Sequence, residues 1–143
     1  MRKSLVVLAF AAALAAVWFI APLEGQGSKK VIFKTADSAD FKEMIPGVSR
    51  AALWGDQDKE AGGVYTKFVP GLDAGMHTHT NDAWIIVIKG AYLYKDDAGE
   101  KRVGPGSFLF VPGGHKHWSG GDPKEGALFY AESSGKFDLI PVK

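Results

Sequence analysis

Short apolar runs separated by turn residues make up most of the chain beyond residue 30. Pro70-Gly71, Pro105-Gly106 and Pro112-Gly113 each end or begin such a run, as turns between strands do. No segment outside the N-terminus repeats apolar residues with the period of an amphipathic helix. The pattern therefore predicts about nine or ten short strands and an all-β sandwich or barrel. We expect strands over residues 31–33, 49–54, 64–69, 83–88, 91–95, 101–103, 107–111, 127–132 and 137–142.

One of these runs differs from the others. Residues 83–88 read Ala-Trp-Ile-Ile-Val-Ile and are apolar at every position, so both faces of the strand would be apolar. Such a strand is buried on both sides, or its outer face meets a partner. Because of this run, we expect that the chain can self-associate as a homodimer.

The N-terminus has a different pattern. Arg2 and Lys3 precede an apolar run over residues 5–20, which is the layout of an export signal. We expect residues 1–25 to be a signal peptide helix, and residues 26–143 to form one exported domain, periplasmic or secreted. The alternative is a retained membrane anchor over residues 5–23, which is nearly long enough to cross a bilayer.

The composition of the chain limits which classes of function and which metal ligands can be expected. The 143 residues are 46% apolar with a net charge of +1, which suits a single domain with one core. No basic run is present, so the sequence gives no reason to expect nucleic-acid binding. The chain has no cysteine, and this excludes disulfides and thiolate ligands. A metal site in this protein would be built from imidazole, carboxylate and water.

All four histidines fall in two His-x-His pairs, His77/His79 and His115/His117. Alternate residues of a strand share a face, so both imidazoles of the first pair can point the same way. Two such nitrogens can bind one ion at about 2.0–2.2 Å. A third imidazole would have to come from the second pair. The tight turn at residues 112–114 can place a strand that carries His117 beside the first.

The spacing around these pairs resembles the two motifs of the cupin superfamily. In the first, Gly71, His77, His79, Ala83 and Gly90 are separated by five, one, three and six residues. In the second, Gly106, Pro112 and His117 are separated by five and four residues. Two motifs with matching internal spacing, in the right order, make the resemblance specific. It implies an antiparallel jelly-roll barrel.

By the same resemblance, His77, His79 and His117 are the expected ligands of a divalent metal ion in the barrel mouth. Two positions depart from the motifs: Ala83 stands where the first motif usually has glutamate, and Gly121 where the second usually has asparagine. The first departure removes one expected ligand. Some three-histidine cupins that lack this glutamate are iron dioxygenases, so the departure leaves metal chemistry open.

Two further residues are candidates for the site. His115 can be a ligand, an outer partner of a ligand, or a residue at the rim. Asp82 precedes the missing glutamate, and a β-bulge could turn it inward. Either residue could act as a general base. The space left by Ala83 could hold water or a substrate carboxylate.

With the resemblance, these observations predict a small exported metal-binding cupin that acts on or binds a small oxygen-bearing ligand, with dioxygenase-like or Lewis-acid chemistry. Imidazole sites accept iron, manganese, zinc, copper and nickel, so the ion stays open. Segments 52–56 and 135–138 are similar to small exported cupins of unassigned function, and more loosely to the zinc-binding cupin domain of some anti-sigma factors. A non-catalytic binding or sensing module is therefore the alternative, and a barrel with an empty or structural site is the third possibility.

Overall fold

The computed structural model describes residues 30–142, and the predicted signal peptide or anchor lies outside them. The main compact unit spans Ile32–Lys143. Within residues 30–142, no helix has the length and apolar character that crossing a bilayer requires.

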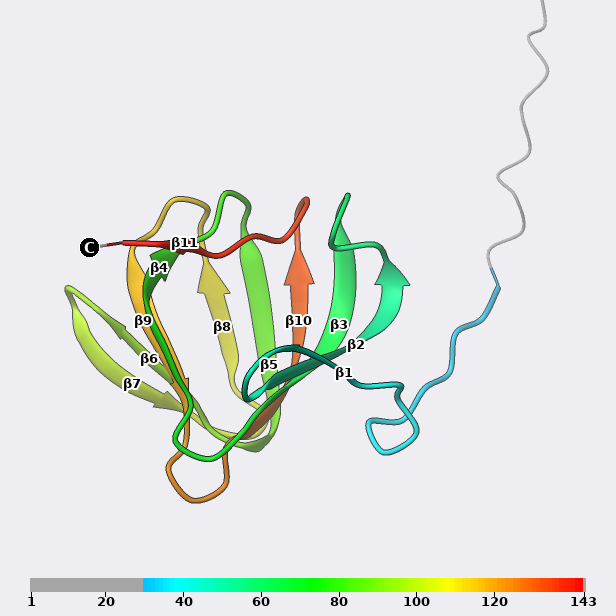
Figure 1. Cartoon of the computed structure of the whole chain (residues 1–143), viewed down its shortest axis with the longest axis horizontal. Coiled ribbons are helices and arrows are strands. Elements are labelled where there is room, and N and C mark those ends of the chain that lie inside the picture. Colours follow the sequence, from blue (N-terminus) through cyan, green and yellow to red (C-terminus); the bar gives the residue numbers. More distant parts are fainter. Residues whose placement is uncertain (1–29, 143) are drawn as a thin grey trace, which may run out of the picture. The chain divides into compact units, whose positions relative to one another are not determined.

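Eleven strands form the unit, in two antiparallel sheets (Figure 1). One sheet has the order β1-β2-β3-β10-β5-β8 and the other the order β11-β4-β9-β6-β7. The strands are β1 (Lys42–Ile45), β2 (Val48–Gly55), β3 (Gly62–Phe68), β4 (Asp73–Thr78), β5 (Ala83–Gly90), β6 (Tyr92–Asp96), β7 (Gly99–Val103), β8 (Phe108–Val111), β9 (His117–Gly121), β10 (Ala127–Ser133) and β11 (Ile140–Pro141). The all-β prediction is confirmed.

The core lies between the two sheets because alternate side chains point inward. On β5, Ala83, Ile85 and Val87 are buried, whereas Ile86 and Ile88 on the other face are exposed. The inner face of β5 packs with Phe129 of the same sheet and with residues of the opposite sheet, such as Tyr92. Of the two expectations for residues 83–88, burial on both sides is therefore wrong for this chain on its own.

The predicted strand over residues 31–33 does not form, and Ile32 and Phe33 are exposed. Apolar and aromatic residues favour a strand only where a neighbouring strand and a packed face receive them. The predicted strand over residues 137–142 is reduced to Ile140–Pro141 for a different reason. The segment before it runs across the end of the barrel, and β11 then pairs with β4 (Figure 1).

The pairing of β4 with β9 positions the two histidine pairs. His77 lies directly opposite His117 in this antiparallel pair. The register of β4 is irregular between Asp73 and Met76, where Gly75 has a φ of +72°, a conformation that favours glycine. The bulge therefore lies immediately before His77 and sets the backbone from which that side chain projects.

Candidate metal site

Three of the four histidines form one cluster. His77 projects from β4, His117 from β9, and His79 follows the end of β4. One ring nitrogen from each lies within 4.8 Å of the others. The three residues are buried, with exposures of 1% for His77, 9% for His79 and 0% for His117. The structure thus brings together the three residues that the spacing singles out.

Backbone carbonyl groups fix the orientation of all three rings. His77 Nδ1 lies 2.8 Å from the carbonyl oxygen of Gly75, and His117 Nδ1 lies 3.0 Å from that of His115. His79 Nδ1 contacts the carbonyl oxygen of Asp138. A carbonyl oxygen only accepts, so each Nδ1 must carry the proton and donate. Each neutral ring therefore keeps a free lone pair on Nε2, the nitrogen available to a metal ion.

A buried nitrogen atom without a hydrogen-bond partner also indicates that the cluster fits a divalent ion. The Nε2 atom of His117 is fully buried and has no hydrogen-bond partner among residues 30–142. A buried polar atom without a partner is rare, because it costs free energy. A metal ion bound by three imidazoles would use this lone pair together with those of His77 and His79.

Electrostatics keep these histidines neutral. Burial is the main cause that lowers the pKa of His77, His79 and His117 below the ordinary value of 6.5. Protonation of a neighbouring imidazole would lower each pKa further, and the hydrogen bonds to carbonyl groups oppose both effects. The neutral form is the one that binds metal, so the environment favours the ligand state at neutral pH.

The structure does not bring His115 or Asp82 into the cluster. The imidazole of His115 is partly exposed, and its Nε2 lies 3.1 Å from Asp96 Oδ2. Its backbone carbonyl contacts the cluster, because it accepts the hydrogen bond from His117 Nδ1. Asp82 Oδ1 accepts a hydrogen bond of 2.8 Å from the amide of Gly113. Asp82 thereby ties the turn of the second motif to the first.

That turn is packed tightly against the first motif. The amide of Gly114 donates to the carbonyl of His79 over 2.7 Å. A Cβ on Gly113 would lie only 2.5 Å from the carbonyl oxygen of Thr80, so no larger residue fits there without backbone movement. The close approach holds the turn before His117 against the end of β4.

A cavity of about 320 Å³ between the two sheets opens onto His77 and His79. Its walls are mainly apolar side chains that point inward from both sheets. They include Val48, Phe68, Ala83, Ile85, Tyr92, Phe129 and Ala131. Ala83 occupies the motif position of the usual glutamate and is buried. Among residues 30–142, no carboxylate joins the histidine cluster.

Sequence reasoning missed three residues of this cavity. The ring of Phe137 lies 4.9 Å from that of His79, and the carboxylate of Asp138 accepts hydrogen bonds from the amide and hydroxyl of Thr80. Arg50, on β2, has its guanidinium carbon 3.7 Å from the centroid of the Phe137 ring. Only the resemblance of segment 135–138 to small exported cupins pointed to part of this set.

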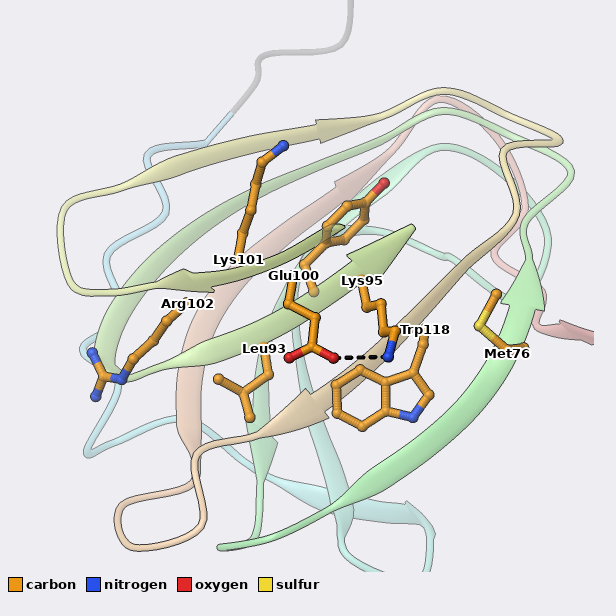
Figure 2. Close-up of a pocket in the computed structure, with 8 residues that line it drawn as sticks. Met76, Leu93, Lys95, Glu100, Lys101, Arg102 and Trp118 are labelled. Atoms are coloured by element: carbon orange, nitrogen blue, oxygen red, sulfur yellow. Dashed lines mark hydrogen bonds and ion pairs between the residues drawn. The ribbon is translucent and has the colours of Figure 1, made fainter. Parts of the chain in front are cut away.

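A second and more open cavity, of about 590 Å³, has no histidine among its lining residues. It lies along β4, β9, β6 and β7, where Met76, Leu93 and Trp118 line it (Figure 2). Its Lys95 and Glu100 already form an ion pair of 2.7 Å with each other. The inner cavity is therefore the one that belongs to the candidate site.

Comparisons with known proteins were consistent with this fold. A model of the family described as a domain of unknown function, DUF4437, matches residues 42–143. None of the curated proteins matches the chain. KdgF from a Halomonas species is 22% identical, with 71% of this chain and 94% of that chain covered and a TM-score of 0.59.

Two other solved structures are similar. An RmlC-like cupin from Shewanella frigidimarina is 22% identical, with 71% and 89% of the two chains covered and a TM-score of 0.59. A chain from the complex of Rhodobacter sphaeroides SigE with the anti-sigma ChrR is 18% identical, with 69% and 50% covered and a TM-score of 0.57. At these identities the likeness establishes the fold, and the predicted cupin-type barrel is confirmed.

Proposed function

Because the chain belongs to the DUF4437 family and has a cupin-like fold, we propose that it is a metal-binding protein whose barrel cavity holds a small oxygen-bearing ligand beside a divalent ion. The observation that carries the proposal is the convergence of three imidazoles whose Nδ1 atoms are all committed to backbone carbonyls. Three nitrogen ligands on one side of an ion leave other coordination positions for a ligand.

An ion in this site would supply Lewis-acid or dioxygenase-like chemistry. The residues of the chain prepare the site for it. The carbonyls of Gly75, His115 and Asp138 hold the rings in one tautomer, and mainly apolar side chains line the cavity beside them. The donor set of three imidazoles suits iron, manganese, zinc, copper and nickel.

A metal analysis combined with turnover assays tests this proposal. We expect purified protein to carry or take up about one equivalent of a divalent ion, and to consume oxygen or convert a substrate within a panel of thiols, diketones and phenols. The variant His79→Ala should lose metal and turnover together. His115→Ala is the matched control, because it removes an imidazole outside the cluster and keeps the carbonyl that orients His117.

A binding or sensing module is the second candidate, and one observation favours it. Both residues considered as general bases are engaged elsewhere, His115 with Asp96 and Asp82 with Gly113. The site then has ligands for a metal ion and a cavity for a small molecule without either of those bases. Tight binding of metal and of a panel compound without turnover would select this function. Failure to bind any divalent ion would contradict both candidates.

We further propose export of the domain, on the charged and apolar pattern of residues 1–25. Fractionation of cells that express the full chain, followed by N-terminal sequencing, tests this. A mature protein in the exported fraction supports cleavage, and a full-length protein in the membrane fraction supports the anchor over residues 5–23. A full-length protein in the cytoplasmic fraction contradicts export.

A further inference from the structure

Arg50 lies on the inner face of β2, inside the cavity that His77 and His79 also line. Its cross-strand partner on β3 is Thr66, which is buried. The guanidinium lies over Phe137, and the same aromatic ring packs against His79. Phe137 therefore links the arginine to the histidine cluster through direct contacts.

The charge of Arg50 is not neutralised inside the barrel. Its side chain forms no hydrogen bond and no ion pair with any of residues 30–142 other than its contact with the Phe137 ring. Asp58 also lines the cavity and raises the pKa of Arg50 through space, but it is exposed and not within ion-pair distance of the guanidinium. Burial outweighs this effect and lowers the pKa to about 10, so the guanidinium is still charged at neutral pH.

The other carboxylates that line the cavity are engaged with neutral groups. Glu132 accepts a hydrogen bond of 3.0 Å from the hydroxyl of Tyr130, and Asp138 accepts two from Thr80. The metal ligands are neutral, and position 83 carries no carboxylate. Among the charged groups that line the cavity, which include Asp58, Glu132 and Asp138, Arg50 is therefore the cation without a hydrogen-bond or ion-pair partner among residues 30–142, and the space beside its guanidinium favours an anion.

Two buried oxygen atoms in the same cavity also lack partners. Gln57 Oε1 and Thr66 Oγ1 form no hydrogen bond with residues 30–142, and the two residues are only 7% and 2% exposed. Gln57 is held in place by its Nε2, which donates to the carbonyl of Gly62 over 2.7 Å. The cavity thus presents a planar guanidinium with its donors, and beside it two buried acceptors.

We propose that the ligand of this cavity is a small organic carboxylate, bound through its carboxylate to Arg50. A hydroxyl or amine of the ligand would donate to Gln57 or Thr66, and its far end would face the histidine cluster. The apolar walls and the volume of about 320 Å³ suit a body of about one ring. The inference deepens the proposed function and rests on it for the position of the metal ion, although Arg50 can bind an anion without metal.

The test uses 4-hydroxybenzoate and its neutral analogue 4-hydroxybenzamide as probes, with calorimetric titration of both metal-free and zinc-treated protein. The wild-type protein should bind the acid about tenfold or more tightly than the amide. Arg50→Gln should abolish this preference, and Arg50→Lys should keep part of it. Arg102→Gln is the matched control, because Arg102 lines the second cavity along β4, β9, β6 and β7. This substitution should leave the preference for the acid unchanged.

Zinc stoichiometry, measured for each variant, separates the proposed anion site at Arg50 from the proposed metal site. Thermal melting shows whether each variant is folded. A preference for the acid in metal-free protein that Arg50→Gln removes supports the inference even if zinc fails to bind, in which case the proposed function alone is wrong. A preference that appears only with zinc and persists in Arg50→Gln overturns the inference, because the ion is then the anion site. Equal binding of acid and amide, or binding of neither at about 10 mM, also overturns it.

Discussion

His77 lies directly opposite His117 on the paired strands β4 and β9, with their ring centroids 4.3 Å apart. The two residues are far apart in sequence, and the register of one strand pair brings them together. Both rings project to the same inner face, since directly opposite residues of an antiparallel pair share a face. His79 lies two residues after His77 along the chain, and its ring packs beside those of His77 and His117. The pairing of β4 with β9 thus brings two of the three clustered histidines together.

The first prediction concerns the metal ligands. His77→Ala and His117→Ala should each lower the affinity for Zn²⁺ more than about 100-fold, above the loss typical for a residue that only supports a ligand. His115→Ala should change it by less than about threefold. Calorimetric titration of metal-free protein measures all of them. Equal affinities for His117→Ala and His115→Ala would show that the cluster is not the binding site.

The second prediction concerns pH. The pKa values of the three clustered histidines are lowered in the folded state, mainly by burial. As pH falls below the ordinary value of 6.5, the unfolded chain therefore binds protons more readily than the folded one. The free energy of unfolding of metal-free protein should decrease until the pH reaches the lowered values, and then level off.

Urea denaturation between about pH 7.5 and pH 5 measures this effect. The decrease should be smaller in His117→Gln, which lacks one of the buried imidazoles, and should persist in His115→Gln. A stability that is constant over this range, or that rises as the pH falls, would contradict the burial of neutral histidines in the cluster.

The third prediction concerns the segment that closes the cavity. The carbonyl of Asp138 orients His79, and its carboxylate is held by the amide and hydroxyl of Thr80. Asp138→Ala keeps the carbonyl but frees the segment, so Zn²⁺ affinity should fall about 10-fold to 100-fold. Asp97→Ala, in the exposed turn between β6 and β7, is the control. An unchanged affinity in Asp138→Ala would mean that the carboxylate does not hold the orienting carbonyl.

The fourth prediction concerns self-association. Ile86 and Phe108 are directly opposite each other on the outer faces of β5 and β8, and are 45% and 62% exposed. Ile88 and Phe110 extend this apolar surface at the edge of the six-stranded sheet. Burial of such a surface is favourable at about 25 cal/mol per Å². We therefore expect a homodimer.

Size-exclusion chromatography with light scattering tests the dimer. Ile86→Lys combined with Phe108→Glu should give a monomer, whereas Lys101→Glu on β7 of the other sheet should not change the mass. A wild-type protein that is monomeric at high concentration would show that this apolar surface does not mediate self-association.

Part of the fold could be predicted from the sequence because burial leaves a pattern. The runs at 64–69 and 127–132 match β3 and β10 closely, since these strands lie side by side in the sheet and bury one face. Strand β1 was missed because all four of its residues are exposed, so no alternation marks it. The false strand at 31–33 shows the converse, since apolar residues without a neighbouring strand have no register to adopt.

The site was less predictable than the fold. Motif spacing singled out His77, His79 and His117, but could not place His115, because that residue lies in the turn segment before β9 and no strand pairing fixes its side chain. The role of Asp82 depends on the Gly113 amide, which only the folded turn brings near. Arg50 gave no signal, because an arginine on a short strand resembles a solvent-facing residue until its pairing with Thr66 is known.

The most direct test of the three-histidine site is a Zn²⁺ titration of metal-free protein, followed by the ¹⁵N resonances of the histidine rings and assigned with single variants. One equivalent should shift the Nε2 resonances of His77, His79 and His117 together, leave their Nδ1 atoms protonated, and leave His115 unchanged. Shifts confined to His115, independent shifts that need several equivalents, or no response of the three rings would contradict the site.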